Sequence, residues 1–120
     1  MIAESIVFAL ALTLAATLQE VDQDNDFISV DQQVQIVADV SNSQDRIQNF
    51  AYLVQIQDQD DVTVSLAWLT GALSPKQTLS PALSWIPKSP GSYTATIFVW
   101  ESVDNPSALS PPLVLPLVVK

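Results

Sequence analysis

Asp22, Asp24 and Asp26 alternate with two amide residues near the start of the chain and are candidate ligands for a metal ion. Carboxylate and amide oxygens are the ligands that Ca²⁺ prefers, so calcium is the one cofactor that this spacing favours. A twelve-residue EF-hand loop beginning at Asp22 would need Gly at its sixth position and Glu at its twelfth. Phe27 and Gln33 stand there, which excludes an EF-hand. The segment is therefore either a simpler Ca²⁺ site or a solvated acidic hinge.

The side chains that carry most enzyme chemistry are missing. The 120 residues include no Cys and no His, which removes Ser-His and Cys-His nucleophile pairs and the usual zinc sites. The only glycines, Gly71 and Gly91, cannot form a glycine-rich phosphate loop. Asp58, Asp60 and Asp61 lie in one polar turn, where no apolar pocket is indicated that would raise a carboxyl pKa for acid–base work. We therefore expect that the protein is not an enzyme.

Composition narrows the class of protein further. Thirteen acidic residues against four basic ones give a net charge of −9, which argues against binding to nucleic acid or to anionic lipid. With 48% hydrophobic and only 14% charged residues, the chain is expected to fold around one core. Such acidity is more typical of proteins outside the cell, so we expect an extracellular or cell-surface location.

Residues 5–18 are strongly apolar, and their side chains alternate in size. The large ones fall on every second position: Ile6, Phe8, Leu10, Leu12 and Leu14. This period of two places them on one face of an extended strand. Such a strand needs a groove to fill, and a neighbouring copy can provide one by β-strand addition.

Two other interpretations of residues 5–18 stay open. A signal peptide has an apolar core of this length, but its leader is basic, whereas this leader contains Glu4 and no Lys or Arg. A transmembrane helix needs about 20 apolar residues, and the run ends at Gln19. Contact with a membrane is therefore expected only through this segment, if at all.

From residue 27 onward, short alternating runs separated by turn residues predict an all-β sandwich of about seven strands and no long helix. The expected strands are 27–30, 34–40, 50–57, 62–68, 79–85, 93–100 and 113–119. Prolines around the run at 79–85 and in and beside the last run, 113–119, predict sheet edges there. The side chains expected to be mostly buried are Val34, Ile36, Val54, Ile56, Leu66, Tyr93, Ile97 and Val99.

The stretch Pro90–Trp100, a turn followed by a tyrosine and a long alternating strand, resembles the penultimate strand of Ig-like and fibronectin-III-like domains. From Val34 through Trp85-Ile86-Pro87 to Ser102, the chain is similar to Ig-like domains of archaeal secreted and surface proteins. The resemblance implies an extracellular structural or adhesive role and no catalytic residues. The apolar arm ahead of a sandwich is similar in plan to donor-strand filament subunits.

Phe98 and Trp100 lie on one face of their strand, and Tyr93 and Ile97 lie on the other. Only one of these two sets can therefore face the core. If Tyr93 points inward, Phe98 and Trp100 need another partner, and we expect a contact between subunits there. Packing within the chain and binding of a glycan by the aromatic rings are the alternatives.

These observations predict an apolar arm and acidic hinge at 1–26 and an Ig-like sandwich at 27–120. The function we expect is that of a pilus-like filament subunit, which polymerises with copies of itself by donor-strand complementation through residues 5–18. The alternative is a secreted or membrane-anchored adhesive or scaffold domain whose N-terminus is an export or anchoring signal.

Overall fold

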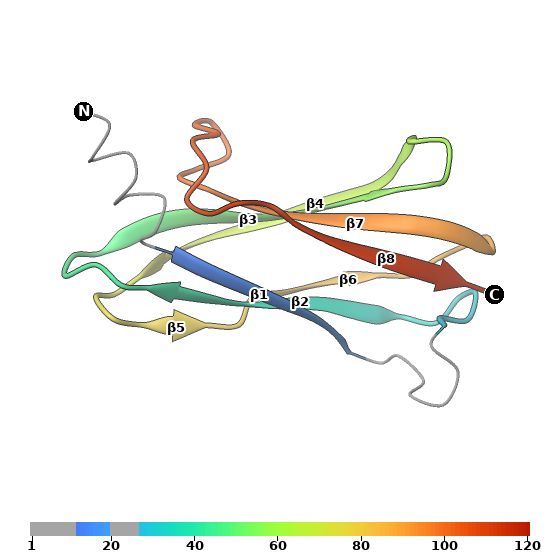
Figure 1. Ribbon diagram of the computed structural model, residues 1–120, viewed down its shortest axis with the longest axis horizontal. Coiled ribbons are helices and arrows are strands. Elements are labelled where there is room, and N and C mark those ends of the chain that lie inside the picture. Colours follow the sequence, from blue (N-terminus) through green and yellow to red (C-terminus); the bar gives the residue numbers. More distant parts are fainter. Residues whose placement is uncertain (1–11, 20–26) are drawn as a thin grey trace.

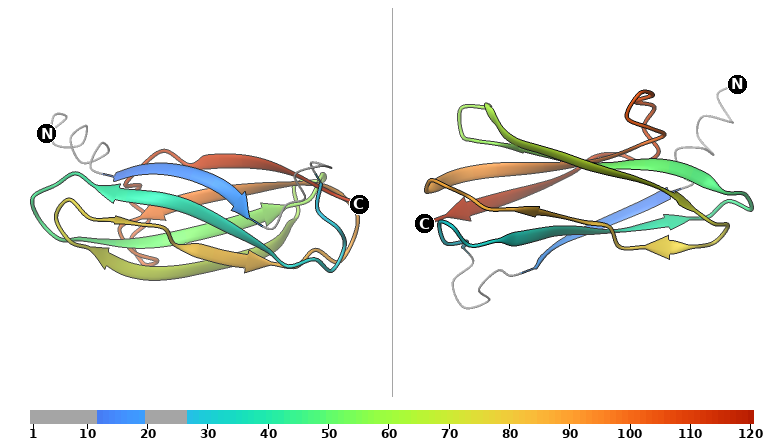
Figure 2. Two further views of the ribbon diagram at one scale, coloured as in Figure 1. Left: turned by 90° about the horizontal axis from the view of Figure 1, so that it is seen from below. Right: turned by 180° about the vertical axis from the view of Figure 1, so that it is seen from behind.

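The computed structural model describes residues 12–19 and 27–120 and consists of two antiparallel sheets of four strands each (Figures 1 and 2). The first sheet contains β1 (Leu12–Gln19), β2 (Val34–Asn42), β5 (Thr78–Leu79) and β6 (Ala82–Trp85), in the order β1-β2-β5 with β6 also paired to β2. The second contains β4 (Thr63–Leu73), β3 (Gln48–Gln57), β7 (Gly91–Trp100) and β8 (Leu113–Val119), in that order. No helix occurs in the described residues, and the predicted Ig-like β-sandwich is confirmed.

The strands follow the predicted runs closely, with two differences. The short strand expected at 27–30 is reduced to a single parallel bridge between Ile28 and Val119. The run at 79–85 is divided into β5 and β6 around Pro81, which cannot donate a ladder hydrogen bond. The structure also adds residues 12–19 to the sandwich as β1, because they pair with β2 along their whole length.

The core lies between the two sheets and contains six of the side chains expected there. Val34, Ile36, Val54, Ile56, Ile97 and Val99 are each at most 3% exposed. Tyr93 is only half-buried, with its ring packed edge-on against Trp85 at a centroid distance of 5.0 Å. The prediction for Leu66 is wrong, since this side chain is 54% exposed.

Leu66 points outward because large residues of β3 fill the core opposite small residues of β4. The register pairs Phe50 with Gly71, and a Cβ at position 71 would come within 3.2 Å of the Phe50 ring. Val54 and Ile56 likewise stand opposite Ala67 and Ser65. Since successive residues of a strand alternate between faces, the large side chains of β4 are turned to the outside.

Candidate functional site

In the described residues, strand β1 lies at an edge of the first sheet and pairs with β2. The antiparallel register places Leu12 opposite Asn42 and Leu14 opposite Val40, at positions of β2 that are at most 1% exposed. Directly paired residues share a sheet face, so positions 12 and 14 lie on the core face of this sheet. The other predicted partner-binding residues of the arm, at positions 6, 8 and 10, lie outside the described residues. The contact of this segment with another subunit stays a prediction.

Phe98 and Trp100 lie on the outer face of the second sheet, the face turned away from the first sheet. Their rings are in contact, with centroids 5.7 Å apart at an angle of 47°. Leu53 stands between Phe98 and Trp68 in one cross-strand row and is only 5% exposed. Packing within the chain therefore covers part of these rings, and the predicted subunit contact stays a prediction.

The outer face carries no charged residue, and its apolar side chains lie among uncharged polar ones such as Gln55 and Thr96. Among the eight strands, only β2 contains a charged residue, Asp39. Exposed apolar side chains nevertheless lie on this face at both edges, with Trp68 of β4 53% and Val114 of β8 60% exposed. A contiguous apolar patch on a protein surface commonly marks an interaction site.

Sequence reasoning missed the exposed residues of β4, because it assigned their alternating large side chains to the core. Alternation predicts which residues share a face, but it does not tell which face is buried. One signal was available in the sequence. Three of the four β4 residues that stand opposite the large alternating residues of β3 are small, as expected for two rows that together fill one core layer: Ser65, Ala67 and Gly71.

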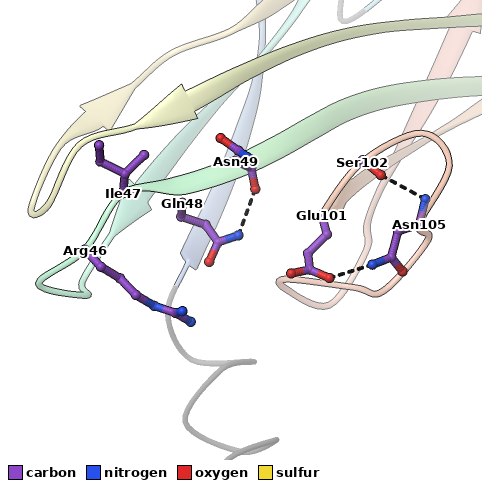
Figure 3. Close-up of a pocket in the computed structure, with 7 residues that line it drawn as sticks. All are labelled: Arg46, Ile47, Gln48, Asn49, Glu101, Ser102 and Asn105. Atoms are coloured by element: carbon purple, nitrogen blue, oxygen red, sulfur yellow. Dashed lines mark hydrogen bonds between the residues drawn. The ribbon is translucent and has the colours of Figure 1, made fainter.

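A polar hollow of about 360 Å³ lies at the end of the sandwich where β3 begins and β7 ends (Figure 3). Its polar groups mostly bond to one another: Gln48 Nε2 donates to the Asn49 carbonyl at 2.8 Å, and Asn105 Nδ2 donates to Glu101 Oε2 at 2.7 Å. The lining residues are Arg46, Ile47, Gln48, Asn49, Glu101, Ser102 and Asn105. Because these donors and acceptors serve the two loops, we assign the hollow no ligand.

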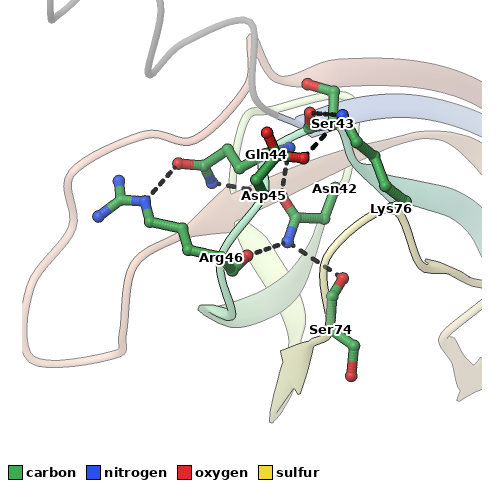
Figure 4. A network of polar contacts seen from close by, with 7 residues as sticks. All are labelled: Asn42, Ser43, Gln44, Asp45, Arg46, Ser74 and Lys76. Atoms are coloured by element: carbon green, nitrogen blue, oxygen red, sulfur yellow. Dashed lines mark hydrogen bonds and ion pairs between the residues drawn. The ribbon is translucent and has the colours of Figure 1, made fainter.

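Asn42, at the end of β2, is a buried polar side chain that ties three segments together (Figure 4). Its Nδ2 donates to the carbonyls of Arg46, Ser74 and Leu73 at 2.8, 3.2 and 3.3 Å. Its Oδ1 accepts from the backbone N–H of Gln44 at 3.0 Å. The amide thus holds the loop after β2 against the end of β4, beside the position where β1 begins to pair.

The acidic turn between β3 and β4 is explained by its own hydrogen bonds. Asp58 Oδ1 accepts from the backbone N–H groups of Asp60 and Val62 at 2.9 and 3.0 Å. Asp61 adopts a left-handed backbone conformation with φ of 62°, as turn residues of this type do. Within residues 27–120 no three acidic side chains are grouped to hold a metal ion. The candidate calcium ligands Asp22, Asp24 and Asp26 lie outside the described residues.

Removal of calcium is expected to destabilise the protein if the three aspartates at positions 22, 24 and 26 bind this ion. A ligand that binds only the folded state stabilises it by mass action, so a chelator should lower the melting temperature. Calorimetry with and without the chelator measures this, and the D22N/D24N/D26N variant should show no such difference. An unchanged melting temperature of the wild-type chain would support the solvated hinge.

The fold places the chain in the class of Ig-like β-sandwich domains, and solved structures agree. The chain is similar to a CARDB domain from Pyrococcus furiosus, solved in complex with di-metal ions, with a TM-score of 0.65 and 17% identity over 91% of this chain and 87% of that chain. It is also similar to the C-terminal domain of Wzt, with a TM-score of 0.68 and 12% identity over 92% of this chain and 74% of that chain.

A third similar structure is a β-glucosidase from Listeria innocua in complex with gluconolactone, with a TM-score of 0.67 and 12% identity. The match covers 90% of this chain but only 16% of the enzyme, so the likeness is to one part of a much longer protein. At such low identities these structures share the fold alone. No family model and no curated protein matches the sequence. The described part of the chain contains no helix of the length and hydrophobicity that a membrane crossing requires.

Proposed function

We propose that this chain is a non-catalytic structural subunit outside the cell, which assembles into a cell-surface filament by passing its N-terminal strand to the next copy. The observation that carries this proposal is the position of β1. Among the described residues it is an edge strand that pairs only with β2. The apolar residues 5–18 include most of this strand.

The contacts that β1 makes with its own β2 can be made equally well with the β2 of a neighbouring copy. The two pairings use the same ladder hydrogen bonds and the same core positions. The free energy of pairing within one chain therefore differs little from that of pairing between copies, except for the contributions of the linker and of the subunit concentration. Residues 19–26 contain no glycine or proline and are mostly polar, which suits a connection that spans two subunits. Exchange in one direction, from each copy to the next, gives an open filament.

The second candidate function is a self-contained adhesive or scaffold domain outside the cell. It is favoured by the pairing of β1 with β2 in a single chain, because this pairing completes the sandwich without a neighbour. Both candidates use the same fold and no catalytic residue. They differ in whether β1 leaves its own chain.

A disulfide that locks β1 onto its own β2 is expected to abolish filament formation. Ala15 and Asp39 are direct partners in the register, and an antiparallel pair lies at a distance that a disulfide can bridge. The chain contains no other cysteine, so oxidation of the A15C/D39C variant as a dilute monomer, before assembly, forms this bond within one chain. Negative-stain electron microscopy should show filaments when this protein is kept reduced and none when the monomer is oxidised first.

The matched control is T96C/V114C, which links β7 to β8, two strands that are not expected to exchange. Its filaments should be the same in both redox states. The filament proposal would be refuted if oxidised A15C/D39C assembled like this control. It would also be refuted if the wild-type chain never polymerised, a result that would favour the self-contained domain.

A further inference from the structure

One lateral side of the sandwich is built by a single continuous part of the chain. Residues 62–86 form β4 in the second sheet, then cross to the first sheet and form β5 and β6. The side of the sandwich that they build lies opposite to the side built by β1 and β8 (Figure 2). We call this surface the β4 side. In the described part of the chain, six of the ten exposed large apolar side chains lie on it: Val62, Val64, Leu66, Trp68, Leu79 and Ile86.

The residues that form the β4 side include no acidic side chain. Residues 62–86 contain no Asp or Glu, although the whole chain has thirteen of them, and their one charged residue is Lys76. Lys76 Nζ lies 3.4 Å from Asp45 Oδ1. Two copies that each carry a net charge of −9 repel one another. Approach through the β4 strands brings together residues that carry no charge of their own, and the nearby Asp39 is hydrogen-bonded to Ser80 of the same side at 2.6 Å.

Strand β4 further offers a long edge with few of the features that usually prevent strand pairing; its one irregularity is a register shift near its start, where Gln57 pairs with Thr63 and Ile56 with Ser65. It has eleven residues, no charge and no proline, and in the described structure it pairs on one side only, with β3. Native proteins blunt such edges with short strands, lysine, proline or a covering segment.

The neighbouring edges show these protections. Strand β8 contains Pro116, and its end is covered by Ile28, whose N–H donates to the Val118 carbonyl at 2.8 Å. The edge formed by β5 and β6 consists of strands of two and four residues interrupted by Pro81. By contrast, the edge of β4 can accept a further strand along most of its length.

We propose that the β4 side binds a second copy of this chain, with the two β4 strands paired antiparallel about a two-fold axis. The pairing joins two four-stranded sheets into one and satisfies the free backbone groups of both edges. A two-fold axis near Ala67 places Leu66 of each copy beside Trp68 of the other, and aromatic–aliphatic cross-strand pairs of this kind are favourable. This contact uses the side opposite to β1 and does not depend on strand exchange.

The test measures self-association of the full chain while β1 is locked by the oxidised A15C/D39C disulfide, so that strand exchange cannot contribute. Sedimentation should show a dimer whose population rises with protein concentration. In this background Leu66→Lys places lysines of the two copies close together at the edge and should weaken the dimer about tenfold or more. Circular dichroism should show an unchanged fold, since this side chain is 54% exposed.

Val114→Lys is the matched control. Leu66, Gln55, Thr96 and Val114 form one cross-strand row, so positions 66 and 114 lie on the same sheet face at opposite edges. The control should dimerise like the locked chain. A locked chain that stays monomeric at every concentration would overturn the proposal, as would equal weakening by both lysines or no weakening by Leu66→Lys. If Leu66→Lys unfolds the protein, Thr70→Lys on the same exposed face of β4 replaces it, with the same criteria.

Discussion

Replacing Asn42 with alanine is expected to lower the free energy of unfolding by about 2–4 kcal/mol, a large part of the stability of a domain of this size. The side chain is 1% exposed, and its amide hydrogens serve carbonyls in the loop between β2 and β3 and at the end of β4. Without it, the buried carbonyl of Leu73 and the part-buried carbonyls of Arg46 and Ser74 lose this donor, which is more costly than the loss of an exposed hydrogen bond. Chemical denaturation measures the effect.

Two variants separate this role from the loss of side-chain volume. Asn42→Asp keeps the shape but replaces the donor with a carboxylate that faces carbonyl oxygens, so it should destabilise the protein at neutral pH at least as much as alanine does. Asn49→Ala removes an exposed amide from β3 and should change the stability by less than about 0.5 kcal/mol. If Asn42→Ala behaved like Asn49→Ala, the network in Figure 4 would not stabilise the fold.

The second large effect concerns Tyr52, whose hydroxyl links the two sheets. The ring lies in the core on β3 with no exposed surface, and the O–H donates to the Ile36 carbonyl of β2 at 3.0 Å. Tyr52→Phe leaves this buried carbonyl without the donor, so the variant should lose about 1–2 kcal/mol of stability at pH 7. The hydroxyl of Tyr93 donates to an exposed carbonyl, that of Ser89, and Tyr93→Phe should therefore have a smaller effect.

The contribution of Tyr52 is also expected to disappear at high pH. Burial raises the pKa of the Tyr52 hydroxyl well above its ordinary value, because the phenolate would be desolvated. The folded state therefore keeps a proton that the unfolded state releases above pH of about 10. This stabilisation is complete below that pH and decreases as the pH rises, by about 1.4 kcal/mol for each further unit.

Urea denaturation of wild type and Tyr52→Phe between pH 8 and about 11 tests this linkage. The difference in stability between the two proteins should be constant up to about pH 10 and should shrink above it. A difference that stayed constant across the whole range would mean that Tyr52 ionises equally in the folded and unfolded states.

Most of the secondary structure follows from the sequence because each strand alternates with a period of two and ends at turn residues. The runs that begin at Val34 and Tyr93 have large β-branched and aromatic residues on the face that becomes the core, and there the prediction is confirmed. The proline at position 116 and the divided run around Pro81 also lie at sheet edges, as proline chemistry requires. In these strands, local side-chain pattern and tertiary packing agree.

The tertiary structure decided what alternation leaves open. Which face of β4 is buried depends on the facing strand: Gly71 leaves room for the Phe50 ring, which a Cβ would approach to 3.2 Å, and Leu66 lies on the opposite, outward face. The pairing of residues 12–19 with β2, and the free edge of β4, depend on the order of strands in each sheet. Sequence periodicity determines which side chains share a face, whereas the neighbour that covers this face is determined only when the two sheets pack together.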